Sequence, residues 1–136
     1  MKFLKILAPA LLGLCLSCSS NRAVENLEGK WYVTDLEGMK ITPSERTPYL
    51  GFNTAQSQMY GYTGCNRLTG ALDAKSFVKG KTNFSRLAST RMLCPDSPYE
   101  APFFKALGRV GKVRIDNHIM CLTDSAGRTL ITLTKE

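Results

Sequence analysis

Cysteine is the residue type of this 136-residue chain with the widest choice of chemistry. The five cysteines are Cys15, Cys18, Cys65, Cys94 and Cys121. A thiol can be acylated, form a disulfide, ligate a metal or act as a nucleophile. Nucleophilic catalysis requires a base within hydrogen-bond reach and a third group that orients this base. The single histidine, His118, lies in the turn-like sequence Asp116-Asn117-His118, and no nucleophile motif is present. We therefore expect no catalytic residues and no enzyme.

The spacing of the same residue types also argues against a metal centre. Three well-separated cysteines follow residue 18, and they have no C-x-x-C spacing of the kind that structural zinc sites use. The acidic residues are sparse, and no pattern suggests the paired carboxylates of a glycosidase. A Gly-rich phosphate loop is absent as well. The sequence therefore predicts no metal and no cofactor.

The N-terminus has the pattern of an export signal. Lys2 and Lys5 precede an apolar run over residues 6–16, which Pro9 and Gly13 interrupt. A membrane-spanning helix needs about 20 apolar residues, so this run is too short to span a bilayer. It fits the apolar region of a secretory signal peptide.

The end of this run resembles a lipobox, the motif in which a cysteine sulfur is acylated before the chain is cut ahead of it. Residues 14–20 read Leu-Cys-Leu-Ser-Cys-Ser-Ser, and small Ser17 directly precedes Cys18. Cys15 occupies the position where leucine is usual, and an ordinary signal peptide cut nearby is the alternative. Ser19 stands where an inner-membrane retention signal would carry aspartate. We therefore expect lipidation at Cys18 and attachment to the outer membrane, facing the periplasm.

These features divide the chain into three expected parts. Residues 1–17 form the signal peptide, residues 18–26 the lipidated cysteine with a polar tether, and residues 27–136 a single domain. The formal net charge is +7. A basic domain in the cytosol would suggest binding of nucleic acid, but an exported protein is separated from nucleic acid, so we expect no such partner. We expect a monomer that contacts the membrane through its lipid, with an envelope protein as a further partner; the basic residues form a solvated surface or face an anionic lipid or acidic partner.

Strand patterns dominate the rest of the chain, which predicts a mainly β (α+β) fold. Segments rich in β-branched, aromatic or alternating residues lie at 30–36, 49–52, 58–63, 70–72, 84–87, 112–115, 119–123 and 129–133. Tight turns join the last three segments, which predicts an antiparallel meander. One segment indicates a helix, because Ser97-Pro98-Tyr99-Glu100 has a capping-box pattern and Phe103 and Leu107 follow at helical spacing. We expect this helix to cover the sheet with both apolar residues in the core.

Two ordered motifs carry a family resemblance. Gly64-Cys65-Asn66-Arg67-Leu68-Thr69-Gly70, followed by Leu87-Ala88-Ser89-Thr90-Arg91-Met92-Leu93-Cys94, resembles the double signature of the META domain, the family of HslJ-like envelope proteins linked to heat shock. The resemblance covers about residues 27–133. It implies a small antiparallel, lipocalin-like β-barrel with one covering helix, found as an envelope lipoprotein. The biochemical activity of the family is not established, and stress response and antibiotic tolerance are its recurring associations.

The paired signatures and their turn contexts predict a disulfide between Cys65 and Cys94. Closing a loop of this length stabilises a fold by about 3–4 kcal/mol on the chain-entropy model. Cys121 lies in the apolar run 119–122 and is expected to stay reduced and buried. A bridge that involves Cys121, or three free thiols, are the open alternatives.

Asn66, Arg67, Thr90 and Arg91 admit two interpretations. They can be architectural, since asparagine bonds the backbone of turns and arginine caps carbonyl groups, or they can form a polar recognition cluster held by the disulfide. Two classes of function fit the chain as a whole. One is a non-catalytic envelope lipoprotein acting through protein or membrane contacts, and the other is a ligand-binding barrel or a hydrolase inhibitor. An interior filled by Trp31, Tyr62 and Phe84 would exclude carriage of a ligand, whereas a cavity of several hundred Å³ would favour it.

The lipobox interpretation generates a direct prediction. Cys18→Ala removes the sulfur that would be acylated, so the variant should incorporate no labelled palmitate and should leave the membrane fraction. Fractionation and labelling of cells expressing either form measure both effects. Retained label on the variant would show that the lipobox assignment is wrong.

Overall fold

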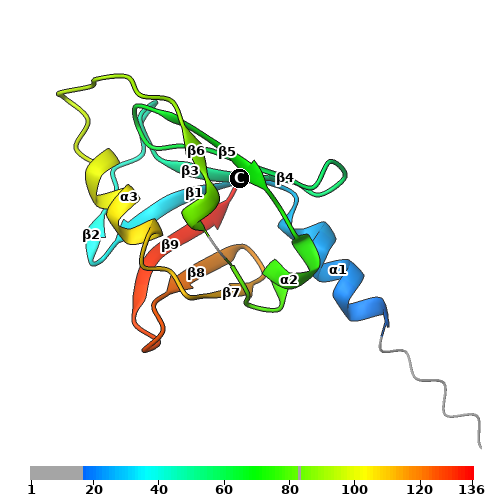
Figure 1. The fold of residues 1–136 in the computed structure, drawn as a ribbon. Coiled ribbons are helices and arrows are strands. Elements are labelled where there is room, and N and C mark those ends of the chain that lie inside the picture. Colours follow the sequence, from blue (N-terminus) through cyan, green and yellow to red (C-terminus); the bar gives the residue numbers. More distant parts are fainter. Residues whose placement is uncertain (1–16, 83) are drawn as a thin grey trace, which may run out of the picture.

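The computed structural model describes residues 17–136 except residue 83 (Figure 1). Its strands are β1 (Gly29–Leu36), β2 (Met39–Lys40), β3 (Tyr49–Asn53), β4 (Gln58–Tyr62), β5 (Arg67–Ala71), β6 (Ala88–Ser89), β7 (Lys112–Asp116), β8 (Ile119–Thr123) and β9 (Thr129–Lys135). Its helices are α1 (Ser17–Leu27), α2 (Ala74–Val78), the 3-10 helix η1 (Phe84–Arg86) and α3 (Glu100–Leu107).

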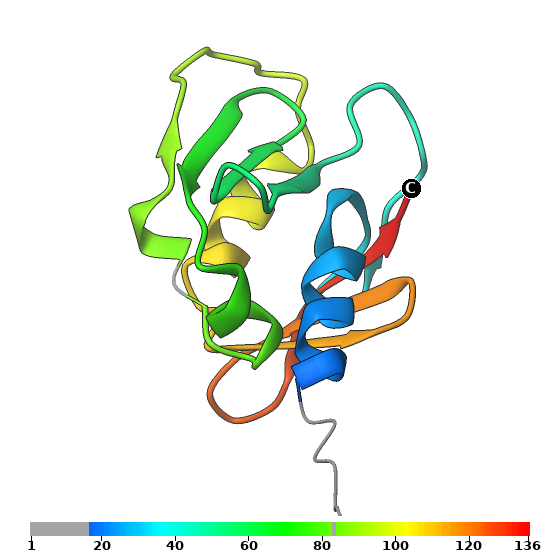
Figure 2. The same ribbon diagram turned by 90° about the vertical axis from the view of Figure 1, so that its right-hand side faces the viewer.

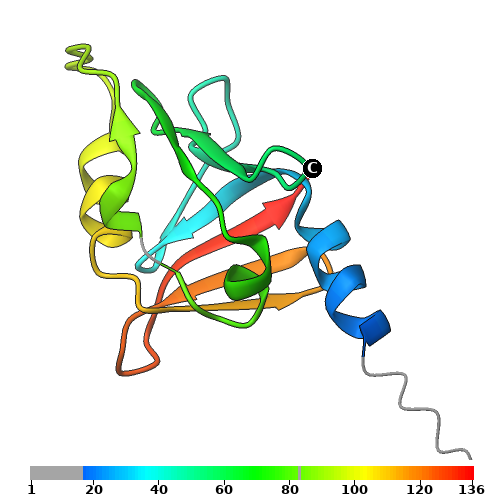
Figure 3. The same ribbon diagram turned by 45° about the vertical axis from the view of Figure 1, so that its right-hand side comes forward.

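The strands form one antiparallel sheet in the order β6-β5-β4-β3-β1-β9-β8-β7, and β2 pairs with β1 beside this path. The sheet curves around the core, but its two edge strands do not pair with each other, so the expected closed barrel is not observed (Figure 3). Strand β6 has only two residues, and α2 and η1 occupy the chain between β5 and β6. One isolated bridge, Lys81 with Lys112, links this segment to β7.

Most of the predicted strands are confirmed, including the C-terminal meander β7-β8-β9. The strand expected over 84–87 is wrong, because Phe84–Arg86 forms a 3-10 turn. Phe84 is buried there and its ring lies 6.2 Å from that of Phe77 on α2. The expectation of a single helix is also wrong. Helix α2 begins after Asp73, whose side chain accepts a hydrogen bond from the backbone N–H of Ser76 as an N-cap.

The core lies on the concave side of the sheet and is filled by side chains. Trp31, Leu50, Phe52, Phe103, Met120, Leu122, Ile131 and Leu133 are among its fully buried members. The Trp31 indole N–H donates to the carbonyl of Leu27 at 2.9 Å, which ties the end of α1 to β1. A buried tryptophan needs such an acceptor, so this bond fixes where the N-terminal helix meets the sheet.

The tyrosines of β1, β3 and β4 lie on the opposite, convex side of the sheet. Tyr62 is half-buried there and does not help to fill the interior. The alternation of β4 places Met59 and Gly61 inward and the two tyrosines beside them outward. The ring of Tyr49 lies 5.6 Å from that of Tyr32 and 5.9 Å from that of Tyr62, at the spacing of cross-strand aromatic pairs.

Helix α1 includes the whole segment expected to be a lipidated cysteine with a polar tether. It begins at Ser17 and ends at Leu27, so residues 18–26 are helical, and its end lies beside α2 (Figure 2). Apart from Ser17, the expected signal peptide lies outside the described residues. Among the helices within residues 17–136, none is both long and apolar enough to cross a membrane.

Helix α3 confirms the predicted core residues but not the predicted cap. Phe103 and Leu107 are buried beneath it, against β1 and β9. The helix begins two residues later than a capping box at Ser97 would place it, and the residue before it, Tyr99, makes no side-chain cap. Ser97, the expected cap, has a buried hydroxyl without a hydrogen-bond partner among the described residues. Glu100 does not complete a capping box either, because its carboxylate accepts hydrogen bonds from Thr63 and Asn66.

Two adjacent phenylalanines of α3 provide a matched test of this packing. Phe103 is 0% exposed and Phe104 is 38% exposed. Phe103→Ala should lower the free energy of unfolding by about 3–5 kcal/mol, because it opens a cavity in the core. Phe104→Ala should lower it by less than about 1 kcal/mol. Urea unfolding of both variants measures the difference, and equal losses would contradict the burial of this face.

Candidate functional site

The turn between β4 and β5 is built around the hydroxyl of Thr63. Its Oγ1 accepts hydrogen bonds from the backbone N–H groups of Cys65 at 3.2 Å and Asn66 at 2.8 Å. Gly64 has a φ of +96°, and a Cβ there would lie 2.9 Å from the carbonyl oxygen of Arg46. Both observations require glycine at this position. The first signature therefore encodes a specific tight turn.

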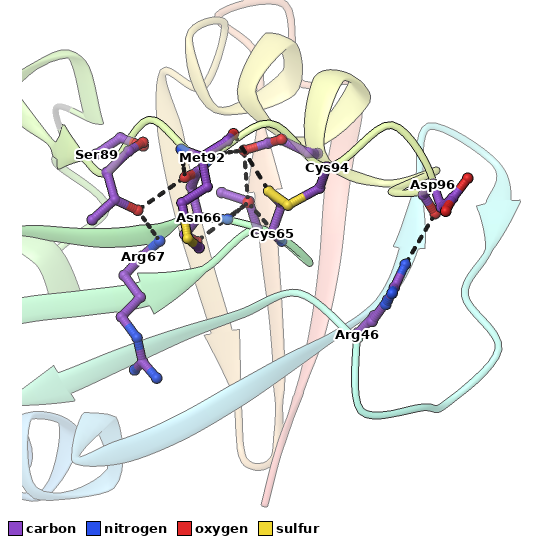
Figure 4. Close-up of a disulfide and its surroundings, with 11 residues drawn as sticks. Arg46, Cys65, Asn66, Arg67, Ser89, Met92, Cys94 and Asp96 are labelled. Carbon is purple, nitrogen blue, oxygen red and sulfur yellow. Dashed lines mark hydrogen bonds between the residues drawn. A yellow bond between two sulfur atoms is a disulfide. The ribbon is translucent and has the colours of Figure 1, made fainter.

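The side chain of Asn66 is buried and makes every hydrogen bond that an amide can make in this arrangement. Its Oδ1 accepts from the hydroxyl of Thr90 at 3.0 Å and from the N–H of Met92 at 2.6 Å. Its Nδ2 donates to the carbonyl of Met92 at 3.1 Å and to the carboxylate of Glu100. Two acceptor sites and two donors are thus all used, and Figure 4 shows how Asn66 faces Met92. Asn66 is an architectural residue that joins three segments.

Glu100 explains the missing cap of α3. Its Oε1 accepts from Asn66 and lies 3.1 Å from the hydroxyl of Thr63, which is fully buried. A carboxylate engaged in this way is not free to accept from the backbone N–H of Ser97, as a capping box would require. The capping-box pattern thus identified Glu100 as an important residue, but its partners are Asn66 and Thr63 rather than the backbone of Ser97.

The disulfide between Cys65 and Cys94 is confirmed, with the two Cα atoms 5.9 Å apart. Cys121 is a free thiol, as predicted. It is half-buried rather than buried, because the alternation of β8 points Met120 and Leu122 into the core and Cys121 to the other side. The bridge joins the turn after β4 to the segment that precedes α3.

The structure divides the predicted polar cluster into two pairs. We call the bonded group of Asn66, Thr90, Glu100 and the disulfide the brace. Thr90 belongs to it because its hydroxyl donates to Asn66 and accepts from the backbone N–H of Arg67 at 2.9 Å. The side chains of Arg67 and Arg91 are exposed. Within the described part of the chain, no hydrogen bond or ion pair is found for either guanidinium. The side chains of Asn66 and Thr90 are therefore structural, and those of Arg67 and Arg91 are available for contacts.

The brace holds residues 90–97, a segment that we call the braced loop, out from the sheet (Figures 1 and 3). Asn66 holds its first half. Its second half is held by the bridge to Cys94 and by Arg46, which donates to the carbonyl of Asp96 at 3.3 Å. At its tip Met92 is 57% exposed and Leu93 is 97% exposed. Leucine is this exposed at no other described position.

Sequence reasoning missed this apolar tip. Met92-Leu93 lies inside the second signature, and nothing in its residue types indicates that it is exposed. A single exposed apolar residue is ordinary, but two adjacent ones on a cross-linked loop form a candidate contact surface. His118, by contrast, is exposed in the turn between β7 and β8. Among the described residues, no three His, Cys, Asp or Glu side chains are grouped as metal ligands would be.

The brace gives a prediction for Asn66. Asn66→Ala removes the acceptor of the Met92 N–H and leaves Glu100 with only the hydroxyl of Thr63, so the free energy of unfolding should fall by about 1–3 kcal/mol. The amide of Met92 should also lose its protection from hydrogen exchange, while the disulfide still forms. Arg67→Ala, which removes only an exposed side chain, is the control and should change stability by about 0.5 kcal/mol or less. An unchanged exchange rate at Met92 in Asn66→Ala would contradict the bracing role.

Comparison with known proteins places this architecture. The family model of the META domain matches residues 25–136. A solved NMR structure of another protein has a TM-score of 0.56 to this chain at 19% sequence identity, covering 83% of this chain and 93% of the other, a likeness that concerns the fold alone. No curated protein matches the chain significantly. Because the family model spans nearly the whole described structure, including both signatures, the chain belongs to the META domain family.

Proposed function

We propose that this chain is a non-catalytic lipoprotein of the bacterial cell envelope whose META domain binds another envelope protein through the braced loop. The export pattern before Cys18 supports the envelope location and the lipid anchor. The polar cluster of Thr63, Asn66, Thr90 and Glu100 supports binding rather than catalysis, because its side chains are already bonded to one another and hold the fold. The recurring association of the family with heat stress and antibiotic tolerance supports a function in the stress response.

The exposed tip of the braced loop is the observation that carries this proposal. Leu93 is 97% exposed on a loop that a disulfide and a buried amide hold in place. Binding normally costs the entropy of ordering a loop, and a braced loop has lost most of that freedom beforehand. Apolar anchors surrounded by polar groups are the usual centre of a protein interface. Arg91 is exposed on the same loop, two residues before Leu93, so a partner with an apolar pocket and an acidic rim fits best.

The position of the loop favours a protein over the anchoring membrane. The braced loop projects at the end of the domain opposite to α1, as the three views of the ribbon agree (Figures 1, 2 and 3). Cys18 lies at the beginning of α1. A lipid on Cys18 would hold that end at the outer membrane, so the tip of the loop would point into the periplasm. A partner there must come to the loop from the side away from the anchor.

The alternative of a hydrolase inhibitor uses the same surface, because a rigid loop can enter the active site of an enzyme. A ligand carried inside a barrel is less well supported. Trp31, Phe52 and Phe103 are fully buried in the interior, and the sheet does not close into a barrel. The identity of the captured protein distinguishes a hydrolase from another envelope partner.

A photo-crosslinking amino acid at position 93 tests the proposal in living cells. It should capture a discrete envelope protein, and placement at position 119 should not, although Ile119 is also 49% exposed. Met92→Ser with Leu93→Ser should reduce co-purification of that protein at least about tenfold, equivalent to about 1.4 kcal/mol, whereas Ile119→Ser should leave it unchanged.

The same loop variant should lower survival of heat to the level of a strain without the gene. Equal capture from positions 93 and 119, or capture of lipid alone at position 93, would overturn the proposed contact. Full heat survival of the loop variant, with capture abolished, would separate the contact from the stress response.

A further inference from the structure

The open side of the sheet contains a pocket away from the braced loop. Its volume is about 490 Å³, within the range of small-molecule sites. It lies where β4 and β5 meet α2 and the chain that runs on to β6. Met59, Leu72 and Phe77, all buried core residues, form part of its lining together with half-buried Leu87. A closed barrel would cover these side chains with further strand, so the pocket is a direct consequence of the open sheet.

The mouth of this pocket is basic. Lys81 and Arg86 belong to its lining, and both side chains are exposed. A second hollow shares Lys81 and adds Lys79 and Lys112, so the cations continue along the open side. The ion pairs found in residues 17–136 involve none of these four.

The single carboxylate in the lining does not neutralise these cations directly. Asp73 accepts hydrogen bonds from the N–H of Ser76 at 3.1 Å and from its hydroxyl at 3.0 Å, at the start of α2. These bonds lower the pKa of Asp73. Both of its oxygens are thus turned to the helix, and Lys81 and Arg86 are left to face a ligand.

We propose that this pocket binds a small amphipathic carboxylate, a molecule with one anionic head and an unbranched apolar tail. The tail packs against Met59, Phe77 and Leu72, whose flexible or aromatic side chains suit a chain without fixed shape. The head lies at the mouth, where Arg86 offers paired donors that match a carboxylate and Lys81 adds a second charge. A small inorganic anion would leave the apolar lining uncovered, and a neutral apolar molecule would leave the cations unused.

Decanoate below its micelle concentration is a suitable probe. The protein is the mature chain, residues 18–136, with Cys18→Ala so that it carries no lipid of its own, secreted so that the disulfide forms. Titration followed by amide NMR should show saturable binding with shifts at Ser76, Phe77 and Leu87. Decanol, which keeps the tail, and acetate, which keeps the head, should each bind at least about tenfold more weakly.

Charge variants separate the site from the general charge of the domain. Lys81→Glu with Arg86→Glu should weaken decanoate binding at least about tenfold, and the milder pair Lys81→Gln with Arg86→Gln should weaken it in the same direction. Lys75→Glu with Arg114→Glu makes an equal change in charge at exposed positions outside the pocket lining and should leave binding within about threefold.

Three results would overturn the proposal: decanol binding as tightly as decanoate, an equal loss in the control pair, or shifts that map to Met92 and Leu93. The last would assign the amphiphile to the braced loop. Because the pocket and the loop are mutated separately, failure here leaves the test of the proposed contact unaffected.

Discussion

The buried amide of Asn66 determines how three separate segments of this domain fit together. Asn66 bonds to Thr90 and Met92 in the braced loop and to Glu100 in α3, so a single side chain fixes the relation between the β4–β5 turn, the loop and the helix. The Asn66 end of each bond is buried, where a polar group without a partner is costly, and the arrangement therefore tolerates little variation. The position of α3, and with it the burial of Phe103, depends on this local network as well as on apolar packing.

The second constraint is that the sheet curves without closing. Strand β6 is too short to continue the sheet, and α2 with η1 covers part of the open side by packing Phe77 and Phe84 over the core. Helices cover the core with fewer exposed backbone groups than an unpaired strand edge would have. They do not match the curvature of a strand, however, and a basic pocket is left beside them. The domain thus has two different surfaces, an apolar projecting loop and a charged hollow.

The sequence predicted those features that depend on local periodicity or on a specific motif. Alternation in 112–133 indicated the meander, helical spacing identified Phe103 and Leu107, and the two signatures paired Cys65 with Cys94. It failed where tertiary partners outweigh local pattern. Phe84 suggested a strand, but its ring is buried against Phe77 in a 3-10 turn. Glu100 suggested a cap, but Asn66 and Thr63 engage its carboxylate. Closure of a sheet depends on pairing between distant edges, which no local pattern encodes.

The disulfide and Asn66 act on different states of the chain, and this difference determines which of them keeps Leu93 exposed. A disulfide stabilises mainly by restricting the unfolded chain, so the bridge from Cys65 to Cys94 raises the stability of the whole domain. It fixes the loop at one point only, next to the tip. Asn66 acts in the folded state, where it holds both the N–H and the carbonyl of Met92 and thus sets the direction in which the chain leaves β6. With the bridge reduced, these bonds would still present Leu93 to solvent. Without Asn66, the bridge at Cys94 and the hydrogen bond from Arg46 to Asp96 would hold only the part of the loop after Leu93, so the direction of the tip depends first on the amide.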